Sequence, residues 1–409
     1  MTVRPALSRP CRRRVVLYSH DTQGLGHTRR NIVIAAALVT ARPDTDVLVL
    51  TGSPEATALP LPPRTEVLTL PTLYKHVDGH YSPRVLSSSL ADVLRMRSRL
   101  IETALSTFEP DLFIVDKVAR GVQGSLDAAL TTLRRDGGTR TVLGLRDVLD
   151  EPLVAVREWA AADTTEAIRD LYDEVWVYGD PVIYDPVEEY SLPPSVADKV
   201  VYTGYLAGPR PPCLQIRYLS HDGAAPPQQP FVLCLVGGGQ DGVDLARAFL
   251  RARLPPGLCG VVLTGPYMPR DQRRELLRDA ESRADMTVRE FVSGADEFVR
   301  RASAAVSMGG YNSVCELLGA GCASLLVPRV TPRMEQALRA ARLARAGWVD
   351  VLPLAEATPG RITEWLSRST GANGTTRRTL DLGGLTRIPR LAERLCAVQA
   401  AREVSHGFG

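Results

Sequence analysis

The sequence predicts an α/β protein built from two doubly wound parallel domains. Apolar runs of about four to eight residues, the length of buried strands, alternate with stretches of helical period along most of the 409-residue chain. Two proline-rich segments, Pro209-Arg210-Pro211-Pro212 and Ala225-Pro226-Pro227, separate these repeats into two series. We therefore expect an N-terminal domain at 12–208, a linker at 209–230, a second domain at 231–387, and a last helix and tail at 388–409.

The apolar runs and the helical stretches give the expected elements in chain order. In the first domain we expect strands at 14–19, 47–51, 65–70, 112–115, 141–145, 174–178 and 200–204. In the second domain they are expected at 231–236, 260–264, 286–291, 304–307, 323–327 and 349–352. Helices are expected at 28–41, 87–108, 121–135, 154–171, 244–252, 270–283, 295–302, 313–319, 333–346, 360–367 and 388–404. Ligands of such sheets bind at the carboxyl ends of the strands, so a cleft between the two domains is the expected site.

Composition narrows the class of protein. The net charge is only +3, which gives no support for nucleic-acid binding. The cysteine count of seven is odd and no C-x-x-C occurs, which favours free thiols in a reducing cytoplasm. No run approaches the ~20 apolar residues of a membrane span. We therefore expect a cytoplasmic protein with at most a peripheral membrane contact through the basic residues before the first strand.

A glycine turn in the second domain leads from a predicted strand into a helix start. Gly309 and Gly310 follow the strand at 304–307, and Glu316 lies one turn into the helix. A helix start favours an anion, because its first N–H groups lack partners and its dipole is positive there. A purely structural alternative is a capping box formed by Ser313 and Glu316.

A second pair of polar residues follows the next strand. Pro328 ends the apolar run at 323–327, and the short loop after it reaches Glu335 and Gln336. A carboxylate and a carboxamide together accept and donate hydrogen bonds, which suits the hydroxyl groups of a sugar. Alone, the pair would be read as a solvated helix start.

Taken together, these segments resemble the nucleotide-sugar site of GT-B glycosyltransferases, especially the MurG-like branch. The likeness lies in the spacing, without a gap, of Gly310, Glu316, Ala320-Gly321, Pro328, Glu335-Gln336, Ala341 and Ala346-Gly347. Arg339 departs from it, because the family commonly has Asn there. The resemblance implies a GT-B fold with two Rossmann-like domains facing across a cleft. It also implies that Glu316 binds the donor ribose, that Tyr311, Asn312 and Ser313 present the helix start to a diphosphate, and that Glu335 and Gln336 hold the transferred sugar.

Two further segments of the second domain match the family. The turn from Gly237 to Gly242 resembles its second glycine loop, in which Gly238, Gly239 and Gln240 are expected to contact phosphates. Phe291 and Val292 end the strand whose backbone lies against the nucleobase in the family. A simple turn and a buried strand end are the structural alternatives.

The loop after the first strand carries the proposed base. It reads Gly24-Leu25-Gly26-His27-Thr28-Arg29-Arg30, which is not a dinucleotide fingerprint because Arg29 stands at the third glycine position. The loop resembles the acceptor-facing turn of MurG-like enzymes, and its Gly-Leu-Gly-His form resembles a bacterial branch of predicted glycosyltransferases. Inverting transfer needs a base for the acceptor proton, and histidine suits that task. We expect His27 to be the base, with His20 as the rival.

An aspartate is expected beside that histidine. Asp116 follows the strand at 112–115, so it should lie at the same sheet edge as His27 and orient its ring. A helix cap is the alternative role for Asp116. The residues expected on the acceptor side are Gly24, Gly26, Lys117, Arg120 and Asp147.

The sequence thus predicts a metal-independent inverting glycosyltransferase. No metal and no other cofactor is expected, since Asp44-Thr45-Asp46 has the D-x-D form but precedes a strand at the opposite sheet end. The donor should be a sugar of UDP, with dTDP and GDP as alternatives. The acceptor is a hydroxyl or amine of unknown identity, with natural products and cell-envelope precursors as candidate classes. A nucleotide-sugar epimerase or hydrolase, and a non-catalytic nucleotide-sugar-binding protein, are the alternative functions.

Overall fold

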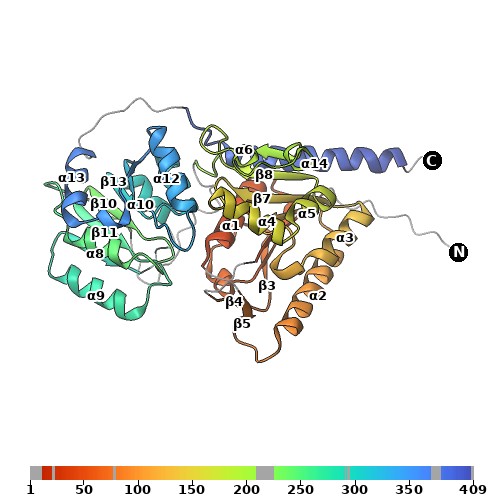
Figure 1. The fold of residues 1–409 in the computed structure, drawn as a ribbon, viewed down its shortest axis with the longest axis horizontal. Coiled ribbons are helices and arrows are strands. Elements are labelled where there is room, and N and C mark those ends of the chain that lie inside the picture. Colours follow the sequence, from red (N-terminus) through yellow and green to blue (C-terminus); the bar gives the residue numbers. More distant parts are fainter. Residues whose placement is uncertain are drawn as a thin grey trace.

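The computed structural model describes residues 12–20, 24–76, 80–208, 225–290, 292, 295–369 and 379–406. Within these residues the chain forms two parallel sheets, each flanked by helices and set side by side (Figure 1). The predicted boundaries of the linker stay a prediction, because 209–224 lie outside the described residues.

The N-terminal sheet has seven strands in the order β3-β2-β1-β6-β7-β8-β9, and all neighbours are parallel. These strands are β1 Arg13–Ser19, β2 Thr45–Thr51, β3 Thr65–Thr69, β6 Leu112–Asp116, β7 Arg140–Arg146, β8 Glu174–Tyr178 and β9 Val200–Tyr202. Its helices are α1 Gly26–Ala41, α2 Leu90–Phe108, α3 Asp127–Asp136, α4 Pro152–Ala161, α5 Thr164–Leu171, α6 Pro186–Glu189 and α7 Pro194–Ala197. Short 3₁₀ turns cover Pro54–Ala58 and Val122–Gly124.

The second sheet has six parallel strands in the order β12-β11-β10-β13-β14-β15. They are β10 Phe231–Leu235, β11 Cys259–Leu263, β12 Met286–Arg289, β13 Ala304–Ser307, β14 Ser324–Leu326 and β15 Asp350–Val351. The helices are α8 Val243–Arg251, α9 Arg270–Glu281, α10 Ala295–Arg301, α11 Tyr311–Ala320, α12 Glu335–Arg345 and α13 Pro359–Ser369. A 3₁₀ turn covers Leu354–Glu356.

The strand order places one switch point in each sheet. In the first sheet the order reverses between β1 and β6, and in the second between β10 and β13. Loops that leave neighbouring strands in opposite directions open a crevice at such a point. The segments that the sequence analysis singled out begin there: the loop before α1 follows β1, Asp116 ends β6, and the two glycine turns follow β10 and β13.

Three details differ from the expected elements. The helix expected at 154–171 is broken into α4 and α5, because Asp163 has left-handed backbone with a φ of 46°. The helix expected at 121–135 begins only at Asp127, because Gly121 and Gly124 have φ angles of 67° and 76°. A small antiparallel hairpin, β4 Leu73–Lys75 and β5 Tyr81–Pro83, was not predicted, since its strands are too short to show a period.

The last helix returns to the first domain. Helix α14, Gly384–His406, lies beside α1 at the N-terminal sheet, where the blue and red segments meet in Figure 1. The carbonyl of Ala392 accepts a hydrogen bond from Arg13, and Ile388 is fully buried in the apolar core. That core cluster also contains Tyr178, Tyr205 and Tyr311, so it runs from one domain into the other. The interface between the domains is thus partly apolar.

Candidate functional site

The two switch points face each other across a pocket of about 180 Å³ between the domains. The N-terminal domain contributes the start of α1 and the end of β7, and the second domain contributes its two glycine turns and the start of α12. The residues that line it are Leu25, Gly26, His27, Arg29, Arg30, Arg146, Gly237, Gly238, Pro266, Tyr267, Gly310, Tyr311, Asn312, Ser313 and Glu335. Many of the predicted site residues are therefore brought to one place.

His27 and Asp116 are in direct contact at this pocket. The ring Nδ1 of His27 lies 2.7 Å from Oδ2 of Asp116, and the Asp116 side chain is only 1% exposed. Arg30, on the next turn of α1, donates to both carboxylate oxygens at 2.7 and 2.6 Å. Burial would raise the pKa of Asp116, but the charges of Arg30 and His27 outweigh it and hold this pKa well below its ordinary value. Asp116 is therefore an anion that can orient the imidazole.

His20 lies next to this pair rather than in it. Its ring centroid is 5.1 Å from that of His27, and the two rings are tilted by 54°. Burial first, and then the nearby charge of His27, lower the pKa of His20 well below its ordinary value. Within the described residues His27 has a carboxylate partner at hydrogen-bond distance, whereas the buried Nδ1 of His20 has no hydrogen-bond partner. The geometry therefore favours His27 over His20 as an oriented base.

The start of α11 closes the pocket from the other domain. The helix begins at Tyr311 with Gly310 as N-cap, and no side chain caps it within the described residues. The capping box of Ser313 and Glu316 is therefore wrong, because Ser313 lies inside the helix rather than before it. Asn312 donates from Nδ2 to the carbonyl of Gly26 at 2.9 Å, so the starts of α1 and α11 abut.

The Tyr311 side chain turns away from the pocket into the domain interface. It is 4% exposed, its hydroxyl donates to the carbonyl of Tyr178 at 2.8 Å, and its ring lies 6.3 Å from that of Tyr205. A diphosphate could meet the backbone of this residue but not its phenol. Tyr311 therefore has a structural side chain, and it stands at a helix start whose first residues line the pocket.

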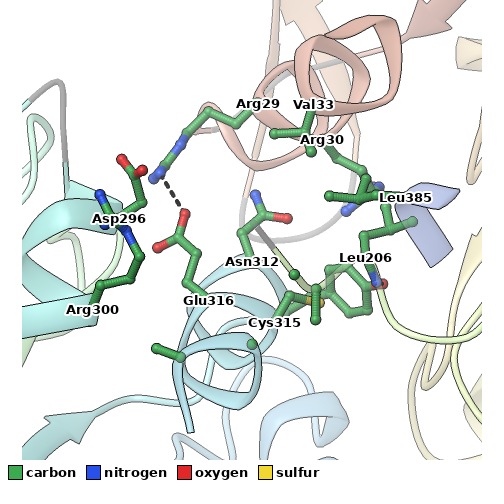
Figure 2. A pocket seen from close by; sticks show the side chains of 15 residues that line it. Arg29, Arg30, Val33, Leu206, Asp296, Arg300, Asn312, Cys315, Glu316 and Leu385 are labelled. Carbon is green, nitrogen blue, oxygen red and sulfur yellow. Dashed lines mark hydrogen bonds and ion pairs between the residues drawn. The ribbon is translucent and has the colours of Figure 1, made fainter. Parts of the chain in front are cut away.

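Glu316 lines a second and larger pocket of about 460 Å³ beside the first (Figure 2). Its Oε1 accepts from Arg29 of the opposite domain at 3.1 Å, and Asp296 and Arg300 of α10 lie on the same side. The other wall is apolar and includes Val33, Leu206 and Leu385. Arg29, Arg30, Tyr311 and Asn312 line both pockets, which therefore adjoin along the contact between α1 and α11.

In the glycine turn after β10, the first two glycines line the cleft and the third packs against the backbone. Gly237 and Gly238 line the smaller pocket, whereas a Cβ on Gly239 would lie 2.1 Å from the Thr264 carbonyl. Gly239, with a φ of 93°, thus serves close packing of the backbone rather than facing the cleft. Gln240 is exposed and is not among the residues that line either pocket. Val292 is buried, and Phe291 lies outside the described residues.

The start of α12 holds the predicted Glu335-Gln336 pair. Both are buried, and Glu335 Oε2 lies 2.5 Å from the guanidinium of Arg146 at the end of β7. Burial would raise the pKa of Glu335, but Arg146 and the other nearby cations lower it to about 2. Gln336 accepts from the Arg329 backbone at 3.3 Å and lines neither pocket. Of the two, Glu335 with its partner Arg146 faces the pocket.

Two of the five residues expected on the acceptor side are paired with other charged side chains. Asp147 is fully buried and paired with Arg339, so the expectation that it faces an acceptor is wrong. Arg120 donates to Asp127 at 2.9 Å and to Asp163 at 3.0 Å and lines neither pocket, so its place on the acceptor side stays a prediction. Of the others, Gly26 lines the smaller pocket, and Gly24 lies just before α1 with a φ of 76°. Burial and the charge of Arg146 lower the pKa of Lys117, whereas the charge of Glu335 raises it.

Sequence reasoning missed two arginines of the site, Arg29 and Arg30, and did not foresee the partner of a third, Arg146. Arg29 and Arg30 stand in the first two turns of α1, near the end whose dipole disfavours basic residues, and Arg146 ends a buried strand. The unfavourable positions of these cations could have indicated nearby acidic side chains, because a cation in such a position usually has an anionic partner. The structure supplies the partners as Glu316, Asp116 and Glu335 respectively.

Two general features of the described residues complete the picture. They contain no group of three or more His, Cys, Asp or Glu side chains arranged to hold a metal ion, and Asp44 and Asp46 pair with Arg42 and Arg64. None of their helices combines the length and the apolar character that a membrane crossing requires.

Residues 232–376 match the sequence model of the glycosyltransferase family 28 C-terminal domain. No curated protein matches the chain significantly. This match covers the glycine turns after β10 and β13 and the start of α12, which together form the second domain's side of the cleft.

Solved structures resemble the chain over nearly its whole length. The calicheamicin glycosyltransferase CalG4 is 17% identical, with a TM-score of 0.55 over 97% of this chain and 98% of that chain. A UDP-glucose:anthocyanidin 3-O-glucosyltransferase in complex with UDP is 14% identical, with a TM-score of 0.57 over 95% and 94%. UDP-GlcNAc 2-epimerase from Methanocaldococcus jannaschii is 10% identical, with a TM-score of 0.59 over 94% and 99%. The chain therefore has the GT-B fold, and its second domain is similar to the C-terminal domain of family 28 glycosyltransferases.

Proposed function

We propose that the protein is a glycosyltransferase that moves a sugar from a nucleoside diphosphate to an acceptor hydroxyl or amine. The observation that carries this proposal is the His27–Asp116 pair, which lies across one pocket from the uncapped start of α11. The match of residues 232–376 to a glycosyltransferase domain supports the donor half of the proposal.

The donor diphosphate would lie at the start of α11. The backbone N–H groups of its first turn and the positive end of its dipole favour an anion there, and Gly237 and Gly238 allow the opposite loop to approach closely. The same groups would stabilise the charge of the leaving diphosphate as its bond to the sugar breaks. This geometry needs no metal ion for that step.

The ribose would lie against Glu316, as the family resemblance implies. In the structure this carboxylate accepts from Arg29, so the ribose hydroxyls would take the place of the guanidinium. The sugar would then lie in the smaller pocket, with Glu335 and Arg146 as its polar contacts. Gln336 would support Glu335 from behind rather than touch the sugar.

His27 would act as the base. We assign a proton to Nδ1, which then donates to Asp116 at 2.7 Å and leaves Nε2 as the basic nitrogen. The acceptor oxygen or nitrogen attacks the anomeric carbon, the bond from that carbon to the diphosphate oxygen breaks, and Nε2 takes the acceptor proton. Attack from the face opposite the diphosphate gives inversion. The proton then leaves His27 for solvent, which restores the base.

Three finer assignments belong to the same proposal. UDP is the first expectation for the nucleotide, in line with the UDP complex of the anthocyanidin glucosyltransferase. The MurG-like branch is proposed from the spacing of Gly310, Glu316 and Glu335. A cytoplasmic location is proposed from the free-thiol composition.

Product analysis tests the proposed activity. Purified protein would be incubated with UDP-, dTDP- and GDP-sugars, with and without a set of hydroxyl and amine acceptors, and the products identified by mass. We expect glycosylated acceptor from the wild type and from His406→Ala, a control histidine at the end of α14, and its loss in His27→Ala. Conversion of the donor without acceptor would instead indicate the epimerase or hydrolase. Donor binding with no turnover of any kind would indicate a non-catalytic binding protein.

A further inference from the structure

Arg30 contacts both His27 and Asp116, and the proposed function gives it no role. The side chain is 3% exposed and lies one helical turn after His27. Its NH2 group is 2.7 and 2.6 Å from the two oxygens of Asp116 and 2.9 Å from Nδ1 of His27. One guanidinium nitrogen thus touches both members of the pair.

The charge of Arg30 has a definite effect at this place. A lone buried aspartate would strongly favour a second proton on the imidazole, because the imidazolium would neutralise it. Arg30 shares the carboxylate and adds a positive charge beside Nδ1, and both effects work against that second proton. The buried carboxylate of Asp116 can therefore orient the imidazole without holding it as an imidazolium. An imidazolium could not accept the proton of the acceptor.

The other side of Arg30 contacts the second domain. Its guanidinium carbon lies 5.5 Å from the ring centroid of Tyr311, on α11. The guanidinium carbon of Arg339, on α12, lies 5.5 Å from the centroid of the same ring. Cation–π contacts of this kind are stronger when they are removed from water, and Tyr311 is buried. Arg30 is therefore held between a carboxylate of its own domain and an aromatic ring of the other.

We infer that Arg30 is a positioning residue that fixes Asp116 and limits the proton affinity of His27, and that its contact with the Tyr311 ring links this arrangement to the donor domain. This inference rests on the proposed function, since it concerns the same base. It goes beyond that function by assigning Arg30 a role at the base and a link to the donor domain.

Other charged groups near His27 are present in every variant considered below. Asp116 is bonded to His27, the His20 ring lies 5.1 Å from it, and Arg29, Arg146 and Glu335 line the same pocket. Lys117 and Arg97 lie close enough to His20 to lower its pKa. Because none of them is altered, a change in the titration of His27 between variants reports on Arg30.

The test is an NMR titration of the histidine rings in the full chain, without donor or acceptor. The chain has six histidines, and the His27 signals would be assigned by their loss in His27→Gln. In Arg30→Gln we expect the pH at which these signals change to rise by about one pH unit, because a positive charge has been removed beside the ring. The control Arg42→Gln, at the exposed end of α1, should leave it unchanged.

A second variant covers the case in which Arg30→Gln does not fold. Arg30→Lys keeps the charge, so the titration of His27 should stay close to that of the wild type. Turnover should nevertheless fall at least about 10-fold, because one ammonium cannot both grip the carboxylate and stack on Tyr311. Equal titration of His27 in the wild type and Arg30→Gln, or full turnover in Arg30→Lys, would overturn the inference. A wild type that transfers no sugar would sink the proposed function alone, since the titration needs no substrate.

Discussion

Arg339 of α12 and Asp147 at the end of β7 form a fully buried ion pair between the two domains. The Nε of Arg339 lies 2.9 Å from both carboxylate oxygens, and its NH2 group lies 2.7 Å from Oδ1. Tyr205 donates a further hydrogen bond to Asp147 at 3.0 Å. Both side chains have zero exposure, so the pair is shielded from water and from salt. This contact fixes α12, and with it Glu335, against the N-terminal domain.

Removal of one partner of this pair should destabilise the protein strongly. Arg339→Met leaves the carboxylate of Asp147 buried without its counter-charge, and such losses cost about 3–5 kcal/mol. We expect a corresponding fall in the free energy of unfolding, measured by urea denaturation. The double variant Arg339→Met with Asp147→Leu should recover part of the loss, because no unpaired charge remains. Losses in the two single variants that simply add in the double variant would contradict the account.

The stability of the protein should rise with pH because of Lys117. Burial and the nearby cations lower the pKa of Lys117 to about 7 from an ordinary value of 10.5. Between these values the unfolded chain binds a proton that the folded chain does not, so raising the pH favours folding. Below about pH 7 Lys117 is charged in both the folded and the unfolded chain. The folded protein then bears the whole cost of burying the ammonium, so its free energy of unfolding is lower there.

The comparison of wild type with Lys117→Met isolates this effect. From about pH 7.5 to about pH 9.5 the stability of the wild type should gain on the order of 2–3 kcal/mol relative to the variant. Urea denaturation at several pH values measures the difference. A difference that stays flat over this range would show that Lys117 keeps its proton in the folded protein.

Glu316 should make nucleotide binding depend on the ribose hydroxyls. Calorimetry would compare the preferred nucleoside diphosphate with its 2′,3′-dideoxy analogue. We expect the wild type to bind the analogue about 10-fold more weakly or worse, because the partly buried carboxylate would give up its bond to Arg29 without gaining the ribose hydroxyls. Glu316→Ala should bind the two ligands equally. Discrimination that survives in Glu316→Ala would place the ribose elsewhere.

The two histidines of the first loop should differ in their effect on turnover. His27→Ala removes the oriented ring and should lower turnover by about 100-fold or more. His20→Ala should lower it by less than about 10-fold, since this ring lies beside the pair and is not bonded to Asp116. Steady-state rates at saturating donor measure both. The opposite order would assign the base to His20.

Local patterns predicted the parts of the site that follow strands directly. The apolar runs located β1, β6, β10 and β13, and the rule for parallel sheets then placed His27, Asp116 and the two glycine turns at the carboxyl edges. The pocket at the two switch points brings these segments together as that rule requires.

Contacts between distant segments could not be predicted in the same way. The Arg339–Asp147 and Arg29–Glu316 pairs join residues of different domains, and no local period records such a partner. The start of α11 was misplaced because Ser313 and Glu316 fit a capping box by spacing alone, whereas the buried Tyr311 fixes the helix start two residues earlier. Arg120 and Asp147 were assigned to an acceptor because a charge near the end of a strand does not show whether it is already paired.

The cleft should bind a nucleoside diphosphate through the second domain. The most direct measurement is a thermal-shift screen of UDP, dTDP, GDP, ADP and CDP with the wild type, Glu316→Ala and His27→Ala. At about 100 times the Kd, one diphosphate should stabilise the wild type by about 2.7 kcal/mol and raise its melting temperature by several degrees. His27→Ala should keep this shift and Glu316→Ala should lose most of it. No shift with any diphosphate, or an equal shift in all three proteins, would contradict the claim.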